Sequence, residues 1–438
     1  MNSKSIAFHH FGCKVNFAEA SALSRQFQEK GYEVKDFHDQ ADIYVISTCV
    51  VTTVAEKKCR AAIRQAHKIN PDARIAVIGC FSELKPGELV EMEGVDLVLG
   101  HTGKFRLLEE ISKLDQPEGT VEIPDHDYHG GLATAPADDS KTFIPSFSYG
   151  DRTRSFLKIQ DGCDYYCTYC TIPLARGRSR SDTVGNVVKN VHEIIANGIR
   201  EIVLTGVNIG DFGKHTGENF LQLIHALDQV EGMLRIRISS IEPDLLNNEI
   251  IDFVAGSAHF LPHFHIPLQS GCNKILKAMH RKYNRELYAS RVEKIKELMP
   301  QACIAADVIV GFPGESDEDF METYNFLKEL PISYLHVFTY SKRDNTLASK
   351  MEMPVPDKIR KERSDALHKL SDEKKKLFYA ENMGSEANVL FESDNSAGFM
   401  HGFTENYIKV KTKFNLAFVN QVVTVRLDQL ENDGYLAG

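Results

Sequence analysis

The first 114 residues alternate short apolar runs with segments whose apolar positions recur every three to four residues. The runs predict strands, and the segments predict amphipathic helices. Strands are expected at residues 5–10, 43–47, 74–78 and 96–99, and helices at residues 18–30, 53–69, 83–91 and 105–114. Buried strands linked by helices favour a parallel sheet, so residues 1–116 are predicted to form a doubly wound α/β domain.

This rhythm stops at residues 117–148, where proline, glycine and aspartate crowd the chain, and a linker is predicted there. The alternation returns at residue 155 with a longer spacing. Strands are expected at residues 155–159, 201–204, 234–238, 262–266, 304–310 and 333–338, and helices at residues 185–196, 221–230, 284–298 and 317–330. Six β/α units fit an open barrel better than a closed eightfold one, so residues 149–378 are predicted to form a partial (β/α)6 barrel.

The last part of the chain changes character twice. A highly charged helix is expected at residues 354–376, and short β-rich runs follow it. These runs lie at residues 388–392, 407–411, 417–419 and 422–427. Short strands at close spacing are typical of a small all-β barrel, which we predict for residues 379–438. The expected fold class is therefore α/β with a small β module at the C-terminus.

Composition narrows the class of protein. The chain has 438 residues, 42% of them hydrophobic and 26% charged, as is usual for soluble globular proteins. Its 51 Lys and Arg residues face 61 Asp and Glu residues, and the net charge of -10 argues against a protein that coats nucleic acid nonspecifically. No run approaches the roughly 18 apolar residues that span a bilayer, and the N-terminus lacks the apolar core of a signal peptide. A cytoplasmic location is expected.

Three of the nine cysteines form a C-x3-C-x2-C pattern, at Cys163, Cys167 and Cys170. Three thiolates this close together can surround one soft metal centre. A four-iron cluster held by three cysteines keeps one iron open to a ligand. The alternative is a closed zinc site with a distant fourth ligand, because zinc normally takes four.

Three further cysteines each follow a predicted strand of the first domain. Cys13, Cys49 and Cys80 should converge, because the carboxyl ends of parallel strands lie on one edge of a sheet. Gly12 and Gly79 precede two of them and permit close approach of the backbone. The alternative is three separately buried thiols, since cysteine packs as a small hydrophobe. Cys59, Cys272 and Cys303 are not assigned as ligands.

The motifs resemble a known family in order along the chain. C-x3-C-x2-C after a first barrel strand resembles the radical S-adenosylmethionine (SAM) superfamily, and the combination with the N-terminal cysteines resembles the radical-SAM methylthiotransferases. The C-terminal module is similar to a TRAM domain, an RNA-binding module. The matching segments are GCKVN (12–16), STCVVT (47–52), GC (79–80), QDGC (160–163), IP (172–173), RGRSRS (176–181), LTGVN (204–208), SSIEP (239–243), LQSG (268–271), DVIVGFPGE (307–315) and FTYS (338–341).

The GCKVN form, followed by C-x-V-T and by AEKK at residues 55–58, is similar to the MtaB-type subgroup. Enzymes of that subgroup convert N6-threonylcarbamoyladenosine at position 37 of tRNA to its 2-methylthio derivative. Ser47 departs from the pattern, since asparagine is common there. The alternatives are a methylthiotransferase for isopentenyladenosine-37 or for a ribosomal protein, and a noncatalytic iron–sulfur RNA-binding protein.

The resemblance implies two 4Fe–4S clusters, one on Cys163, Cys167 and Cys170 and one on the N-terminal triad. The first would bind SAM and cleave it reductively to a 5′-deoxyadenosyl radical. Polar residues at barrel strand ends face one mouth, where they can reach SAM, although capping of loops is the alternative for each. The expected SAM contacts are Tyr169, Thr205, Gly206, Asn208, Ser239, Glu242, Gln269, Asp307 and Gly311. Asp161 is the candidate catalytic acid/base, or else only positions its loop.

The implied partners are the anticodon loop of tRNA, an electron donor such as flavodoxin or ferredoxin, and a sulfur donor, with no membrane. Arginine and aromatic side chains suit RNA, because they grip phosphate and stack on bases. The candidates are Arg152, Arg154, Arg176, Arg178 and Arg180, with Tyr165 and Tyr166 between them. Lys409, Lys411 and Lys413 alternate along one strand side and suit a backbone contact. The lysine-rich helix is an alternative contact or a solvated face.

Overall fold

The computed structural model describes residues 4–50, 52–114, 142–150, 153–233, 235–431 and 436–437. Most of the predicted linker, residues 117–141, lies outside the described residues. The chain divides into two compact units. Unit 1 is Met1–Ser148, Asp161–Asp164 and Cys170–Ser179, and unit 2 is Tyr149–Gln160, Tyr165–Tyr169 and Arg180–Gly438. Unit 1 thus takes in two short stretches that follow the first barrel strand in sequence.

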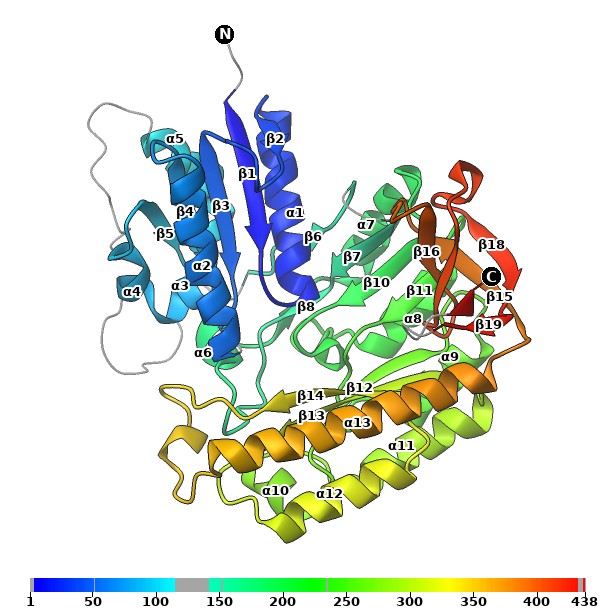
Figure 1. The fold of residues 1–438 in the computed structure, drawn as a ribbon. Coiled ribbons are helices and arrows are strands. Elements are labelled where there is room, and N and C mark those ends of the chain that lie inside the picture. Colours follow the sequence, from blue (N-terminus) through cyan, green and yellow to red (C-terminus); the bar gives the residue numbers. More distant parts are fainter. Residues whose placement is uncertain are drawn as a thin grey trace. The chain divides into compact units, whose positions relative to one another are not determined.

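The core of unit 1 is a five-stranded sheet in the order β2-β1-β3-β4-β5, with every pair of neighbours parallel. Figure 1 shows these strands side by side in blue and cyan. Their bounds are β1 (Ser5–His10), β2 (Glu33–Lys35), β3 (Ile43–Thr48), β4 (Arg74–Gly79) and β5 (Val95–Leu99). The predicted parallel α/β sheet is therefore confirmed. The strand order reverses between β1 and β3, which is where ligands bind in sheets of this kind.

Alternating side chains bury both faces of this sheet. Ile6, Val45 and Ile78 face a cluster that includes side chains of α1 and α5. Their neighbours in sequence face a second cluster, which includes side chains of α2 and α3. The helices are α1 (Lys14–Glu29), α2 (Thr53–Ile69), α3 (Cys80–Leu84), α4 (Pro86–Val90), α5 (Leu107–Leu114) and, in the Cys170–Ser179 stretch, α6 (Ile172–Arg176), with a 3-10 turn η1 (Gly103–Arg106) before α5. Helices on both faces make the domain doubly wound.

Two helix predictions in unit 1 were imprecise. Helix α1 begins at Lys14 rather than at residue 18, because Cys13 stands in extended conformation as its N-cap directly after the loop from β1. The helix expected at 83–91 is two short helices with Lys85 between them. Pro86 causes the break, since a proline disfavours helical conformation in the preceding residue and donates no N–H. Strand β2 was missed, because three residues are too short for a period to show.

Unit 2 contains six parallel strands in chain order. They are β7 (Arg154–Lys158), β10 (Glu201–Thr205), β11 (Arg235–Ile238), β12 (His263–Gln269), β13 (Cys303–Val310) and β14 (Tyr334–Thr339). β7, β10 and β11 are paired, as are β12, β13 and β14. Isolated parallel bridges at Ile236–Phe260 and Ser240–His265 join the two sets. The predicted partial (β/α)6 barrel is confirmed; residue 234, where one strand was expected to begin, lies outside the described residues.

Helices alternate with these strands along the chain. They are α7 (Val184–Ala196), α8 (Phe220–Asp228), α9 (Asn248–Gly256), α10 (Asn273–Ala278), α11 (Arg285–Leu298), α12 (Asp317–Glu329) and α13 (Asp357–Glu381), with 3-10 turns η3 (Ile209–Asp211) and η4 (Ala348–Lys350). Figure 1 shows the long helix α13 along β13 and β14, where the Ser371 hydroxyl accepts a hydrogen bond from Leu335 N. Three two-residue strands lie before or after β7: β6 (Ser146–Phe147), β8 (Gln160–Asp161) and β9 (Arg180–Ser181).

The C-terminal module is a curled, mostly antiparallel sheet in the order β18-β15-β16-β17-β20-β19, which agrees with a half-barrel. Its strands are β15 (Glu386–Phe391), β16 (Phe399–Phe403), β17 (Lys409–Lys413), β18 (Val422–Arg426), β19 (Gln429–Leu430) and β20 (Leu436–Ala437). The strand expected at 417–419 is wrong: η5 (Leu416–Phe418) occupies that place, capped by the Asn415 side chain. Phe378 and Tyr379 of α13 share its core.

Buried arginines of the barrel bind the C-terminal module within unit 2. Arg235 donates to the carbonyls of Asn388 and Phe403, at 2.9 and 3.0 Å. Arg237 donates to the carbonyls of Thr404 and Glu405, at 2.7 and 2.8 Å. The carboxylate of Glu201 holds both guanidinium groups at 2.8 Å. Although burial opposes it, Arg237, Arg235 and Arg154 lower the pKa of Glu201 to about 2, so the carboxylate stays charged.

Candidate iron–sulfur and cofactor site

The N-terminal cysteines stand at the carboxyl edge of the unit 1 sheet. Cys13 follows β1 and caps α1, Cys49 directly follows β3, and Cys80 begins α3 after β4. None of these three cysteines forms a disulfide; Cys13 is exposed and the other two are buried. Gly12 has a φ of +99°, and a Cβ atom on it would lie 2.8 Å from Cys49 Cβ. Glycine is therefore required for the Cys13 and Cys49 loops to approach this closely.

Two cations and a second cysteine act on the thiol of Cys80. Burial raises the pKa of the Cys80 thiol, while Arg176 and Lys104 oppose the rise, and Cys13 adds to it. Cys13 and Cys80 are thus close enough to act on one another, and two cations of unit 1 stand near them. Such cations favour thiolates, which are the form that binds metal.

The three remaining cysteines have a different environment. Cys59, Cys272 and Cys303 are each no more than 1% exposed. Burial raises their pKa to about 11 for Cys59, about 11 for Cys272 and about 12 for Cys303. Buried, protonated thiols of this kind behave as small apolar side chains.

The cysteines of the C-x3-C-x2-C loop form no disulfide either. Cys163 and Cys170 belong to unit 1, where Ile172 N donates to Cys170 Sγ at 3.5 Å. Cys167 belongs to unit 2, where Arg281 Nη1 donates to its sulfur at 3.1 Å. Before the first cysteine, a Cβ atom on Gly162 would lie 2.0 Å from the Arg178 carbonyl, so this position admits glycine alone.

Three of the expected SAM contacts have buried polar atoms that lack a hydrogen-bond partner among the described residues. They are Asn208 Oδ1, Ser239 Oγ and Gln269 Oε1. Each residue lies at or just after the carboxyl end of a barrel strand, β10, β11 and β12 respectively. Because buried polar atoms are normally paired, these atoms fit a polar ligand at the barrel mouth.

Other expected SAM contacts are engaged with the protein itself. Thr205 Oγ1 donates to the Val203 carbonyl at 3.1 Å. A Cβ atom on Gly206 would lie 2.9 Å from Gln160 Oε1, and this oxygen accepts hydrogen bonds from Val207 N and Asn208 N. The glycine therefore lets Gln160 shape the loop after β10.

Tyr169 and Gly311 lie further along the same unit. The Tyr169 ring packs edge-on against Phe312, beside an apolar cluster that contains Cys272 and Met279. Gly311 N donates to Glu315 Oε2 at 2.7 Å, and a Cβ atom on Gly311 would collide with Arg360. These contacts give Gly311 a role in packing the turn after β13.

Glu242 forms a close ion pair with Arg281. Arg281 therefore bonds both this carboxylate and the Cys167 sulfur. Burial raises the pKa of Glu242 to about 7, and Arg281 opposes that rise. The arginine has no distinguishing mark in the sequence and was missed, since only the fold brings the turn after α10 to the cysteine loop.

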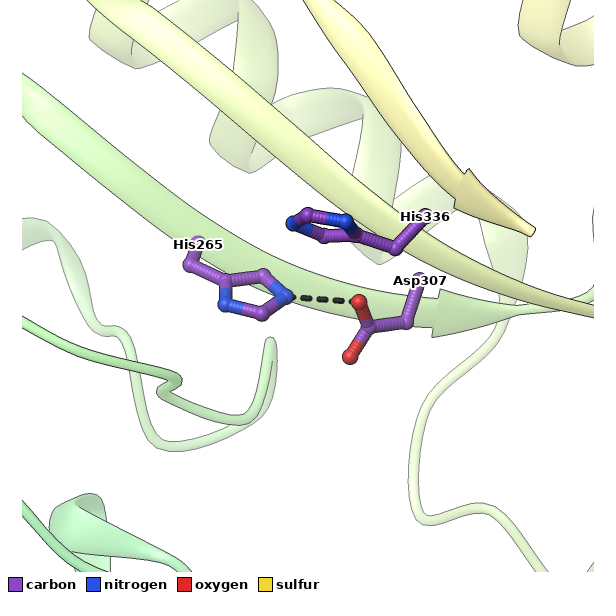
Figure 2. Close-up of side chains that lie close together, drawn as sticks. All are labelled: His265, Asp307 and His336. Atoms are coloured by element: carbon purple, nitrogen blue, oxygen red, sulfur yellow. Dashed lines mark hydrogen bonds and ion pairs between the residues drawn. The ribbon is translucent and has the colours of Figure 1, made fainter. Parts of the chain in front are cut away.

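Asp307, on β13, contacts His265 rather than standing alone. His265 Nε2 lies 2.6 Å from Asp307 Oδ1, and the His265 and His336 rings have centroids 5.1 Å apart. Figure 2 shows the three side chains gathered on adjacent strands β12, β13 and β14. Two imidazoles and a carboxylate can bind a divalent ion, and they equally suit hydrogen bonding to a polar ligand. Both histidines were missed, because a lone histidine in a strand carries no signal.

Asp161, the expected acid/base, is buried in unit 1 with both carboxylate oxygens engaged. Oδ1 accepts hydrogen bonds from Gly162 N and Arg176 Nη1, each at 2.9 Å. Oδ2 lies 3.1 Å from His101 Nε2. These partners hold the loop before Cys163. His101 lies two residues after the end of β5, at the same sheet edge as the cysteines, and this position after a predicted strand could have been recognised in the sequence.

The arginines expected to grip RNA are mostly buried, and that prediction was wrong for Arg154 and Arg176. Arg154 pairs with Glu201 and Glu392 in unit 2, and Arg176 pairs with Glu19 and Asp161 in unit 1. Arg180 is buried too, and Arg152 lies outside the described residues. Their clustering reflected internal ion pairs; Arg178, 60% exposed beside Asp164, is the one that solvent reaches among those described.

The aromatic and lysine candidates divide in the same way. Tyr165 is buried and its hydroxyl donates to Asp244 Oδ2 at 2.6 Å, whereas Tyr166 is 52% exposed. On β17, Lys411 pairs with Glu431, and Lys413 is exposed. On α13, Lys374 donates to the carbonyls of Lys328 and Leu330. That lysine stabilises the end of α12 rather than facing solvent freely.

Comparisons with known proteins agree with this geometry. Residues 5–100 match the model of the uncharacterized protein family UPF0004, and residues 157–327 match the radical SAM superfamily. The chain is 40% identical to the threonylcarbamoyladenosine tRNA methylthiotransferase MtaB of Bacillus subtilis, over 97% of this chain and 93% of that one. It is 40% identical to the Aquifex aeolicus protein of that name, over 93% and 96% of the two chains.

A more distant relative has another substrate in its name. The tRNA-2-methylthio-N(6)-dimethylallyladenosine synthase of Fusobacterium nucleatum is 32% identical over 97% of each chain. Among solved structures, the radical SAM methyltransferase TsrM of Kitasatospora setae, with cobalamin and a 4Fe–4S cluster, matches with a TM-score of 0.55. That match has 16% identity over 77% of this chain and 72% of the other, and it supports the fold alone.

The barrel, with a C-x3-C-x2-C loop after its first strand and unpaired polar atoms at its strand ends, defines a radical SAM enzyme. The similarity to the relatives extends along nearly the whole chain and narrows the family within this superfamily. The chain belongs to the tRNA methylthiotransferase family of radical SAM transferases. No helix among the described residues has the length and apolar character needed to cross a bilayer.

Proposed function

We propose that this chain methylthiolates C2 of N6-threonylcarbamoyladenosine at position 37 of tRNA. The observation that carries the proposal is the 40% identity to two enzymes named for this substrate, over nearly the full length of the chain. The GCKVN segment around Cys13 agrees with it. Relatives named for dimethylallyladenosine are less similar, at 30–34% identity, and their substrate is the second candidate.

Cys163, Cys167 and Cys170 would hold the 4Fe–4S cluster that, when loaded, supplies the electron for reductive cleavage of SAM. Their support is the spacing and the hydrogen bonds that the sulfur atoms of Cys167 and Cys170 accept. Around the barrel mouth, Asn208, Ser239 and Gln269 would bind SAM through their unpaired atoms. Thr205, Gly206, Asp307 and Gly311 would shape the pocket, with Tyr169 beside the adenine and Glu242 at the ribose.

Cys13, Cys49 and Cys80 would hold a second 4Fe–4S cluster, the site of the sulfur that is transferred. The donors fit: three cysteines outside disulfides at one sheet edge, a glycine that admits Cys49, and two cations that favour thiolates. Asp161 would orient the cysteine loop through its buried contacts.

The partners follow from this chemistry. The substrate is tRNA, and the C-terminal half-barrel would act as a TRAM-like RNA-binding domain over residues 379–438. Residues 1–116 and 149–378 would be the methylthiotransferase and radical SAM domains, joined by a linker at 117–148. An electron donor such as flavodoxin or ferredoxin would serve the first cluster, and tRNA substrate implies a cytoplasmic location.

The test is nucleoside mass spectrometry of tRNA from a deletion strain. We expect loss of the 2-methylthio group from threonylcarbamoyladenosine alone, restored by the wild-type gene and not by a Cys13→Ala/Cys49→Ala/Cys80→Ala gene. Loss from isopentenyladenosine instead would move the assignment to the second candidate. Purified protein reconstituted without oxygen should hold about eight irons, and the triple variant about half of that.

A further inference from the structure

Five buried side chains of unit 1 form a closed ring of charges and hydrogen bonds. Its members are Glu19, Lys104, His101, Asp161 and Arg176, and none of their side chains is more than 5% exposed. Lys104 Nζ donates to Glu19 Oε2 at 2.6 Å and to His101 Nδ1 at 3.1 Å. Arg176 closes the ring between the two carboxylates. Removing four charges from water costs free energy that their pairing often only offsets. We therefore expect the ring to have a role besides stabilising the fold.

One set of contacts links Arg176 of this ring to the N-terminal cysteines. Arg176 donates to the side-chain oxygen of Asn16, a residue of α1. The amide nitrogen of Asn16 donates to the carbonyls of Phe11 and Thr48, at 2.9 and 3.0 Å. Phe11 lies in the loop that carries Cys13, and Thr48 ends β3 directly before Cys49. Arg176 therefore bonds the residue that ties both cysteine loops together.

Another set of contacts links the ring to the C-x3-C-x2-C loop. Arg176 ends helix α6, six residues after Cys170, and its partner Asp161 accepts a hydrogen bond from Gly162 N. Cys163 N in turn donates to the Gly177 carbonyl at 3.1 Å. The two stretches of this loop that belong to unit 1 are thus joined by the contact of Arg176 with Asp161 and by this backbone hydrogen bond.

The charge on Arg176 is secured by what faces it. Burial opposes that charge, but Cys80, Glu19, Asp161 and Cys13 raise the pKa of the guanidinium well above its ordinary value. Two of these four groups are cysteines of the N-terminal site. Arginine keeps its charge in folded proteins, so Arg176 places a positive charge near that site.

We infer that Arg176 is the positioning residue that sets the Cys163 and Cys170 stretches against the Cys13 and Cys49 loops, and that places a fixed positive charge beside the N-terminal cysteines. The inference rests on the proposed function, in which both cysteine triads hold clusters. Arg176 touches neither substrate nor SAM in this role. It acts through Asn16 and Asp161, and the planar fork of an arginine is required because it serves Asn16, Glu19 and Asp161 at once.

The two parts of this role predict separate consequences. A guanidinium that aligns the loops determines how often SAM cleavage leads to product. A buried cation near a cluster stabilises its reduced, more negative state, so removing the cation shifts the reduction potential to more negative values. A merely structural residue would change neither of these in protein that keeps its fold and iron.

The test compares Arg176→Gln with Arg64→Gln, which changes an exposed arginine of helix α2 in the same unit. The potential of the N-terminal cluster is measured by redox titration with EPR in a Cys163→Ala/Cys167→Ala/Cys170→Ala background. Coupling is measured in the otherwise wild-type chain, as the ratio of methylthiolated nucleoside to 5′-deoxyadenosine. We expect Arg176→Gln to shift the potential to more negative values and to lower the ratio about tenfold, while Arg64→Gln changes neither. An unchanged potential and ratio in iron-replete Arg176→Gln would overturn the inference.

A second variant keeps the test decisive if Arg176→Gln folds poorly. Glu19→Gln/Arg176→Gln removes one charge of each sign, so the ring stays neutral. We expect this double variant to fold and load iron but to keep the low ratio of methylthiolated nucleoside to 5′-deoxyadenosine, because Asn16 and Asp161 have lost their hydrogen bonds to the guanidinium group. A ratio equal to that of the wild type would overturn the inference. Failure of the proposed function is separately visible, since wild-type protein would then give no methylthiolated threonylcarbamoyladenosine at all.

Discussion

The guanidinium of Arg176 donates a hydrogen bond to the carboxylate of Asp161 at 2.9 Å, and both side chains are buried. A carboxylate held by a permanent cation, a backbone N–H and an imidazole is poorly placed to exchange protons with a substrate. The contact therefore favours a role for Asp161 in placing the cysteine loop over a role as a catalytic acid/base.

Replacing Asp161 by asparagine should therefore act on stability. We expect Asp161→Asn to lower the free energy of unfolding by about 3 kcal/mol, because Arg176 would lose a charged partner in a buried site. Asp365→Asn, whose partner Lys361 is exposed, should cost less than about 1 kcal/mol. Urea unfolding measures both. Unchanged stability together with a shifted pH profile of product formation would instead support the acid/base role.

His101 should make unit 1 sensitive to mild acid. Burial first, and then Lys104, lowers its pKa from 6.5 to about 3. Below about pH 6.5 the unfolded chain gains a proton that the folded protein refuses until about pH 3, so stability falls across this window as the pH decreases. His101→Gln, which cannot take up that proton, should show a flatter profile. Thermal unfolding of both proteins without iron, between about pH 7.5 and pH 5.5, checks this; parallel profiles would contradict it.

The unpaired Ser239 hydroxyl gives a direct test of the SAM pocket. We expect Ser239→Ala to weaken SAM binding roughly fivefold, the effect of one lost hydrogen bond. Its neighbour Ser240, whose hydroxyl is not among the buried unpaired atoms, is the matched control, and Ser240→Ala should bind SAM as the wild type does. Equilibrium dialysis on the reconstituted protein measures both constants. Equal affinities in the two variants would remove Ser239 from the pocket.

Glu201 should decide how firmly the C-terminal module is held. Glu201→Gln removes the negative charge shared by Arg154, Arg235 and Arg237, and we expect it to cost about 3 kcal/mol. Limited proteolysis should then release the module earlier than in the wild type. Glu193→Gln, on the exposed face of α7, serves as the control. Identical digestion of the two variants would show that the carbonyl contacts of the arginines suffice alone.

Local pattern was enough for the elements and for the cysteines. Apolar periodicity placed every strand of the barrel within a few residues, because buried strands and amphipathic helices differ in period. The positions of Cys13, Cys49 and Cys80 after successive strands predicted one shared edge, and the sheet has all three there. Chain topology alone carries that inference, since parallel strands end on the same side.

Contacts between distant charges were beyond reach of the sequence. The arginines of segment 152–180 looked like an RNA surface, yet Arg154 and Arg176 are buried against partners 47 and 157 residues away. Arg281 meets Cys167 across 114 residues, and His265 meets Asp307 across 42.

The two domains with parallel strands, the β-rich module and the two cysteine triads could be predicted from the sequence, because they depend on period and spacing along the chain. Tertiary structure decided which charged side chains face solvent and which neutralise one another inside. The physical reason is that an isolated charge strongly prefers water, so its burial depends on a partner that only the folded chain brings near.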